Sequence, residues 1–196
     1  MSDVDRPIAL DLPPGLAEAA RRFQRTLALG RAAQAPLLLG PGQMGKRRLV
    51  AEGQHPDLLQ APAPLKVDGL RQLLAELALR PVEAAWRVAL VPDVDLATPN
   101  AANALLKTLE EPPERALLLL SASRQELVLP TIRSRCRQVF LRPPSPELLA
   151  AFLLDTGRME DPVRAAGLAR RAAGRLEWAL AVAADAALER DLDQAM

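Results

Sequence analysis

The sequence predicts an α/β fold: a parallel β-sheet with helices on both faces, followed by a small all-helical unit. Short apolar runs alternate with stretches of helical periodicity as far as residue 142, a pattern typical of strands joined by crossover helices. After the proline-rich stretch 143–146 the chain reads as helices only, rich in Ala, Leu and Arg. We therefore expect an α/β domain over residues 1–142 and a helical domain over residues 143–196.

The elements expected before residue 65 are two helices and two strands. Apolar residues spaced three and four positions apart predict an amphipathic helix over residues 15–30. The apolar run Pro36–Leu39 predicts a short buried strand, and a second helix should begin near Gly45 after a glycine-rich turn. A further short strand is expected over Asp57–Gln60, before a proline-rich connector.

The middle of the chain predicts a helix, a strand and a second helix. Asp68 is the expected N-cap of a helix that reaches about Leu79. The run Arg87–Val91 predicts a buried strand. Thr98 is the expected N-cap of the next helix, which should stop before Pro112, because proline cannot continue a helix.

Two strands around a short helical piece complete the α/β domain. The apolar run Ala116–Leu120 predicts a buried strand, and Gln138–Leu141 predicts another. Between them we expect a short helical piece over Leu129–Arg133. The domain boundary should fall at Arg142–Ser145, where the prolines begin and the alternation of strands and helices ends.

The composition excludes several classes of protein. With three Phe, two Trp and no Tyr, the chain lacks the aromatic side chains of a surface that stacks single-stranded bases. The net charge of +1 gives no strong nucleic-acid footprint. Cys136 is the only cysteine, which excludes an internal disulfide and a four-thiolate zinc site. Because its apolar runs are too short to span a bilayer, we expect a soluble, cytoplasmic protein.

A phosphate-binding loop is predicted where the first strand meets the second helix. Residues 40–46 fit the pattern G-x-x-x-x-G-K. Gly40, Gly42 and Gly45 let the backbone wrap a phosphate, and Lys46 supplies a positive charge for it. The plainer interpretation is a glycine-rich turn that is kept for its backbone geometry alone.

The residues that would hold Mg²⁺ in such a loop are missing. Arg47 stands where a Ser or Thr hydroxyl should bind the metal, and a guanidinium cannot ligate a cation. An active ATPase also needs an Asp-Glu pair after the strand Arg87–Val91. In one alignment Pro92 and Asp93 replace that pair. If the alignment is shifted by one residue, Asp93 becomes the metal ligand, but Val94 then stands in place of the catalytic base. We expect no metal site and no intrinsic ATPase, and weak binding of ATP or ADP stays open.

Three further segments carry a family resemblance. Residues 99–113 contain Asn-Ala-Leu-Leu-Lys-Thr-Leu-Glu-Glu-Pro-Pro, and residues 131–136 end in Ser-Arg-Cys. His55-Pro56-Asp57 is followed by residues 67–71, Val-Asp-Gly-Leu-Arg. In this order the segments resemble the bacterial DNA polymerase III clamp-loader subunits, over roughly residues 15–180. The resemblance implies an AAA+-type P-loop domain with a three-layer parallel sheet, followed by a small helical lid.

Within that family, the degenerate phosphate loop resembles the delta-prime subunits rather than the hydrolysing gamma/tau subunits. The resemblance implies a non-hydrolysing ring member that requires no cofactor. Its Arg135, in the Ser-Arg-Cys motif, would act as an arginine finger at a neighbouring ATP site. The implied partners are the gamma/tau and delta subunits. The sliding clamp and primed DNA are reached through the complex, and no membrane is involved.

Two other interpretations stay open. The first is a gamma/tau-like ATPase that binds and hydrolyses ATP with unusual metal ligands. The second is an inert remnant that folds but engages no partner. Without the resemblance, Arg133, Arg135 and Arg137 read simply as a solvated basic segment.

The chain also departs from the family pattern. Family members carry a four-cysteine zinc module before the His-Pro-Asp turn, whereas here only residues 46–54 lie there, without a cysteine. We therefore expect no zinc. The chain ends at Met196, before the helical collar domain of these subunits. In the expected lid, Gly174-Arg175-Leu176 is similar to the family's glycine-led helix, which makes Arg175 a candidate nucleotide sensor.

We expect four further residues to have structural rather than catalytic roles. His55, the only histidine, is expected in a turn, because no second ligand or base accompanies it. Glu110 and Glu111 are expected to mark a helix end. Cys136 is expected to be a small buried apolar group rather than a reactive thiol.

Overall fold

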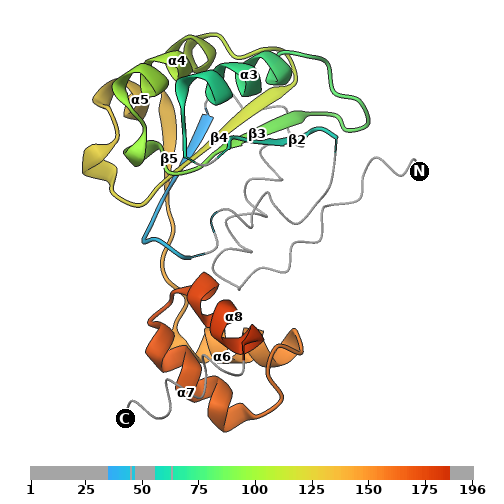
Figure 1. The fold of residues 1–196 in the computed structure, drawn as a ribbon, viewed down its shortest axis with the longest axis vertical. Coiled ribbons are helices and arrows are strands. Elements are labelled where there is room, and N and C mark those ends of the chain that lie inside the picture. Colours follow the sequence, from blue (N-terminus) through green and yellow to red (C-terminus); the bar gives the residue numbers. More distant parts are fainter. Residues whose placement is uncertain (1–34, 45, 47–55, 63, 186–196) are drawn as a thin grey trace.

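The sheet is the centre of the fold in the computed structural model, which describes residues 35–44, 46, 56–62 and 64–185. Five parallel strands are arranged in the order β2-β3-β4-β1-β5 (Figure 1). The strands are β1 Ala35–Leu39, β2 Leu58–Gln60, β3 Arg87–Val91, β4 Ala116–Ala122 and β5 Cys136–Phe140. The predicted α/β class is confirmed.

Helices α3 (Val67–Leu77), α4 (Pro99–Glu110) and α5 (Pro130–Arg133) lie together on one face of this sheet (Figure 1). Two short 3₁₀ helices, η2 (Val94–Leu96) and η3 (Gln125–Leu127), follow the carboxyl ends of β3 and β4. Strands of a parallel sheet need crossover connections, and these helices supply them between β2, β3, β4 and β5.

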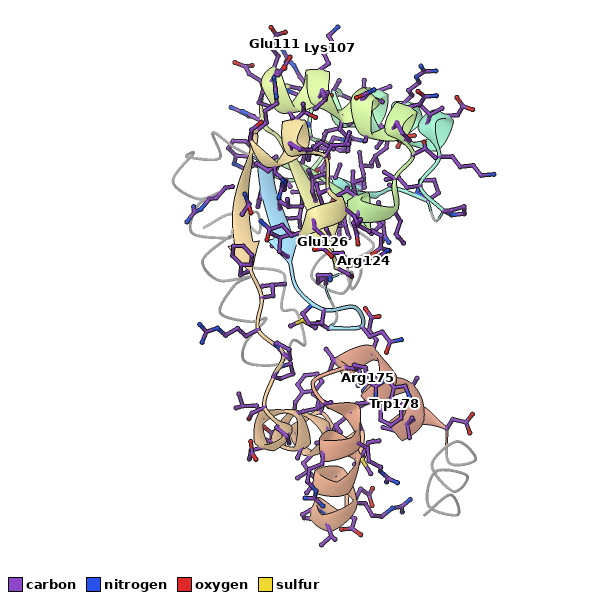
Figure 2. All side chains as sticks on the ribbon, turned by 90° about the vertical axis from the view of Figure 1, so that its left-hand side faces the viewer. Lys107, Glu111, Arg124, Glu126, Arg175 and Trp178 are labelled. Carbon is purple, nitrogen blue, oxygen red and sulfur yellow. The ribbon has the colours of Figure 1, made fainter. Side chains whose placement is uncertain are left out.

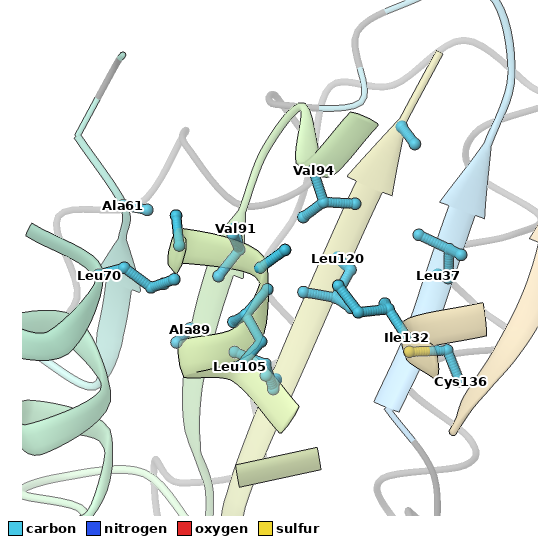
Figure 3. Close-up of a cluster of buried hydrophobic side chains, with 14 of the residues drawn as sticks. Leu37, Ala61, Leu70, Ala89, Val91, Val94, Leu105, Leu120, Ile132 and Cys136 are labelled. Carbon is cyan, nitrogen blue, oxygen red and sulfur yellow. The ribbon is translucent and has the colours of Figure 1, made fainter. Parts of the chain in front are cut away.

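The main core lies between the sheet and this helical layer. Figure 3 shows Leu70 of α3, Leu105 of α4 and Ile132 of α5 directed toward the strand residues below them, and all three are fully buried. Burying each such side chain contributes about 2 kcal/mol. Leu38 and Leu90, which alternate with residues of this core along their strands, are also buried. The sheet is therefore covered on both faces, as parallel sheets usually are.

Three helices follow the sheet: α6 (Pro146–Asp155), α7 (Pro162–Ala172) and α8 (Leu176–Ala184). They enclose a second apolar cluster. Each of the first two begins with proline after a capping side chain: Ser145 Oγ accepts the Leu148 N–H at 3.3 Å, and Asp161 Oδ1 accepts the Val163 N–H at 2.8 Å. The proposed domains 1–142 and 143–196 stay a prediction.

Several element boundaries differ from expectation by one or two residues, for example the end of β4, which reaches Ala122 rather than Leu120. Helix α3 begins at Val67 with Lys66 as its N-cap, so Asp68 lies inside the first turn. Strand β5 begins at Cys136 rather than Gln138, because it pairs with β1 from Ala35↔Cys136 onward. The helices predicted over 15–30 and from about Gly45 lie outside the described residues. Within the described ranges, no helix has the length and apolar character needed to cross a membrane.

Candidate functional site

A cavity of about 240 Å³ lies at the carboxyl end of the sheet, where the loop after β1 meets the helical part. Open α/β sheets commonly bind ligands at this edge. The cavity is lined by Gly42, Gln43, Lys46, Asp93, Ser121, Ser123 and Glu177. It therefore brings together part of the predicted phosphate loop with residues that follow β3, with β4 and with α8.

The loop backbone runs close to the following strand. A Cβ on Gly40 would lie 2.9 Å from the Leu141 carbonyl oxygen, so this position requires glycine. Gln43 adopts a φ of 60°, a left-handed conformation that is uncommon for a residue with a side chain. Gly45 and Arg47, which complete the predicted motif and its metal position, lie outside the described residues.

Lys46 is turned back onto its own loop. Its side chain is buried, and Nζ donates to the carbonyl oxygens of Gly40, Pro41 (3.0 Å) and Ala122 (3.1 Å) and to Ser123 Oγ (3.1 Å). An ammonium group has three N–H donors, so these four oxygens engage all of them.

Acidic residues surround this lysine. Burial lowers the pKa of Lys46, and the nearby carboxylates of Asp93, Asp95 and Glu177 oppose that shift. Lys46 is therefore compensated from within the chain rather than presented as a free positive charge.

Asp93 and Asp95 have different positions after β3. Asp93 lines the cavity and caps η2 in a left-handed conformation, with a φ of 51°. Asp95 is almost buried, and its Oδ2 accepts the N–H groups of Ser123 (3.3 Å) and Arg124 (3.0 Å). Asp95 thus ties η2 to the end of β4 and plays a structural part. Among the described residues, no group of three or more His, Cys, Asp or Glu side chains is arranged to hold a metal ion.

Helix α8 contributes a carboxylate to the cavity instead of the guanidinium that the sequence suggested. The Glu177 N–H donates to the Gln43 carbonyl oxygen at 2.8 Å, and the Glu177 side chain lines the cavity. Arg175 donates to carbonyls at the end of α7 and stacks on Trp178, with 5.0 Å between its guanidinium carbon and the ring centroid (Figure 2). Arg175 is not among the lining residues. The sequence analysis did not identify Glu177, because its place at the cavity depends on the contact between α8 and the loop after β1.

Arg135 lies in a second, separate place. Its side chain is 36% exposed and is fixed by Glu110, the last residue of α4. Arg135 Nε donates to Glu110 Oε1 at 2.8 Å, and NH1 donates to the Thr131 carbonyl at 3.0 Å. Glu110 indeed ends a helix, as expected, but it also joins the Leu-Glu-Glu-Pro-Pro segment to the Ser-Arg-Cys motif.

Arg135 and the phosphate loop lie at opposite ends of the strands of the sheet. Arg135 immediately precedes β5, whose first residue, Cys136, pairs with Ala35 at the start of β1, whereas the phosphate loop follows Leu39 at its end. Along β1, the four residue steps from Ala35 to Leu39 span about 13 Å. In Figure 2, Glu111, which follows Glu110 at the end of α4, lies at the end of the molecule away from Arg175, the residue before α8.

Cys136 is a buried, protonated thiol. It packs in the main core at 7% exposure, and burial raises its pKa to about 12. The interpretation as a small apolar group is confirmed. His55 lies outside the described residues.

The comparisons with known proteins point to one family. A family model described as “DNA polymerase III, delta subunit” matches residues 45–145. The DNA polymerase III subunit delta' of Escherichia coli (strain K12) is 37% identical over 140 residues, which cover 69% of this chain and 42% of that protein. The Yersinia pestis subunit delta' is 34% identical over 117 residues, covering 57% and 34%. The chain therefore spans about a third to two fifths of the length of these relatives.

Related sequences and structures extend beyond delta'. The DNA polymerase III subunit tau of E. coli is 36% identical over 97 residues, covering 48% of this chain and 15% of that protein. A gamma subunit-related protein of Thermotoga maritima superposes with a TM-score of 0.57 at 24% identity, covering 79% of this chain and 60% of that chain. The RuvB Holliday junction branch migration motor of T. maritima gives 0.61 at 17% identity, covering 85% and 60%. These structures support the AAA+-type P-loop fold.

Proposed function

Because the chain belongs to the DNA polymerase III delta subunit family, we propose that it is a non-hydrolysing clamp-loader subunit that presents Arg135 to a neighbouring ATPase. The observation that carries this proposal is the separation of Arg135 from the chain's own phosphate loop. They lie at opposite ends of β1 and β5, so Arg135 cannot reach a phosphate bound by Lys46. Any phosphate that Arg135 contacts must therefore be held outside the chain's own loop.

The contacts of Arg135 suit such a role. Glu110 and the Thr131 carbonyl orient the guanidinium, while about a third of the side chain stays exposed. An oriented guanidinium stabilises the charge of a transferring phosphoryl group, and an arginine finger supplied in trans raises turnover by about 10³–10⁵. Glu110 acts as a positioning residue in this scheme.

The state of the chain's own loop supports the absence of hydrolysis. Lys46 is engaged by oxygens of the protein. In either alignment of residues 92–95 one catalytic position is empty, with Pro92 at the metal-binding Asp or Val94 at the base. No cofactor is required by this scheme, and ATP or ADP would at most bind weakly.

The proposed partners are the clamp-loader gamma/tau and delta subunits, with the sliding clamp and primed DNA reached through the complex. Similarity to both delta' and tau supports a place among such subunits. A gamma/tau-like ATPase is the second candidate, favoured by the retained loop pattern and the 36% identity to tau. It predicts ATP turnover by this chain alone.

The test is the DNA- and clamp-stimulated ATPase rate of gamma/tau subunits with this chain added. We expect the wild-type chain to raise the rate and Arg135→Ala to bind the partners equally but to lose at least tenfold of the rate. Arg137→Ala is the matched control, because Arg137 is an exposed arginine two residues away on β5, and it should stimulate normally.

Equal stimulation by wild type and Arg135→Ala would overturn the arginine-finger role. Failure of the wild-type chain to bind any partner would instead support the inert remnant.

A further inference from the structure

The guanidinium of Arg135 is already engaged by an acidic residue of its own chain. Nε donates to Glu110 Oε1 at 2.8 Å, and NH2 contacts the same oxygen, while NH1 donates to the Thr131 carbonyl at 3.0 Å. The edge formed by Nε and NH2 is one through which an arginine binds a carboxylate or a phosphate with two N–H groups. Glu110 and a phosphate of a neighbouring subunit would therefore compete for the same edge of Arg135.

The negative charge of Glu110 does not stabilise its own helix. Glu110 is the last residue of α4, where the helix dipole disfavours a carboxylate and favours a cation such as Lys107. Within the continuously described range 64–185, the ion pair of Glu110 is made with Arg135, 25 residues later in the chain. The carboxylate is thus matched to Arg135 rather than to α4.

The pair is exposed enough to be opened. The Arg135 side chain is 36% exposed and the Glu110 side chain is 51% exposed. Ion pairs of this kind are weak, because water and salt screen both charges. A triphosphate carries several negative charges, and screening falls when a second subunit covers the pair. A phosphate held by a neighbour can therefore displace the single carboxylate of Glu110.

We propose that Glu110 is a gate on Arg135: it holds the guanidinium while no phosphate is near, and a phosphate of the neighbouring subunit displaces it. This inference rests on the proposed arginine-finger function and adds the regulation of that site. Glu110 positions Arg135 before the exchange, and its competition sets how readily the chain engages an ATP-bound partner. If Glu110 only positioned Arg135, its removal would weaken stimulation, whereas removal of a gate strengthens it.

The test is a titration of gamma/tau subunits with this chain, read as their DNA- and clamp-stimulated ATPase rate. We expect Glu110→Gln to reach half-maximal stimulation at a concentration about threefold lower than wild type, the size expected when one exposed ion-pair competitor is lost. Combining Glu110→Gln with Arg135→Ala should abolish this gain. Glu111→Gln is the matched control, since Glu111 is an exposed glutamate that directly follows Glu110, and it should titrate like wild type (Figure 2).

A second measurement tests the pair in the free chain. The Nε–H resonance of Arg135 in an NMR spectrum is assigned by its absence from Arg135→Lys. We expect this resonance to shift in Glu110→Gln, because the charged acceptor at 2.8 Å is lost, and to stay in place in Glu111→Gln. An unchanged resonance in Glu110→Gln would show that the pair does not form, and the gate would fail.

Three results of the titration would overturn the gate alone. One is a half-stimulating concentration of Glu110→Gln that equals or exceeds that of wild type, with Glu110→Ala giving the same answer if the first variant unfolds. Another is an equal gain in Glu111→Gln, which would report the overall charge of this surface. The third is a gain that survives Arg135→Ala. Equal stimulation by wild type and Arg135→Ala would instead overturn the proposed function, and the gate with it.

Discussion

At the residue scale, one buried carboxylate organises the segment before β3. Asp57, from the His-Pro-Asp turn, accepts N–H groups of Val82 (2.7 Å), Glu83 (2.8 Å) and Ala84 (2.8 Å) and lies 3.6 Å from the Arg87 guanidinium. Burial opposes its ionisation, but these N–H groups and Arg87 outweigh that effect and hold the pKa of Asp57 below its ordinary value of 3.8. The motif residue is thus structural here.

This arrangement predicts a pH-dependent stability. Because the folded state lowers the pKa of Asp57, its contribution is fully present above the unfolded-state value and is lost as the pH falls through the lower, folded value. Asp57→Asn should cost about 2 kcal/mol of unfolding free energy at pH 7. The difference from wild type should shrink below pH 3.8. Urea unfolding at a series of pH values measures both quantities.

Asp68→Asn is the control for that series. The Asp68 side chain is 92% exposed and contacts Arg71 only at 3.9 Å, so its replacement should change stability by less than about 0.5 kcal/mol at any pH. A pH profile of Asp57→Asn that runs parallel to wild type down to acid would contradict the role given to this carboxylate.

At the element scale, local signals predicted most helices and strands. Strand β3 has the predicted bounds Arg87–Val91, and Thr98 caps α4 as expected, with its Oγ1 accepting the Ala101 N–H at 3.3 Å. Both predictions depend only on residues that are neighbours in the sequence. The start of β5 was missed because it is set by pairing with β1, about a hundred residues earlier, and its polar residues give no apolar run.

The link between α7 and α8 depends on Gly174. This glycine has a φ of 80°, and a Cβ there would lie 2.4 Å from the Pro143 Cβ. Gly174→Ala should therefore lower the unfolding free energy by about 2 kcal/mol or more. Gly167→Ala, in the middle of α7 with open space around it, should raise it by about 0.5–1 kcal/mol.

Thermal or urea unfolding of both glycine variants tests this account. Because the two substitutions are chemically identical, opposite signs would reflect the backbone conformation and the space at each glycine. Equal effects of the two variants would show that neither the positive φ nor Pro143 restricts position 174.

At the scale of the whole molecule, the candidate site is assembled from four segments far apart in the sequence. The loop after β1, the residues after β3, the end of β4 and the first turn of α8 all line one cavity. The loop could be predicted because its pattern is local, and the absence of metal ligands stays a prediction. Glu177 and the Glu110–Arg135 pair were not predicted, because each depends on a tertiary contact that no spacing encodes.

At the same scale, the two candidate sites of the chain lie apart. The phosphate loop follows the carboxyl end of β1, and Arg135 precedes the opposite end of β5, with its side chain 36% exposed. Under the proposed function, all hydrolysis in a complex with gamma/tau subunits should occur on those subunits.

The most direct test of this claim is the ATPase rate of the complex when the partner gamma/tau subunits carry alanine in place of their own phosphate-loop lysine. We expect turnover to disappear, although this chain retains Lys46. ATP hydrolysis that persists in that complex, and then vanishes when Lys46→Ala is introduced here, would contradict it.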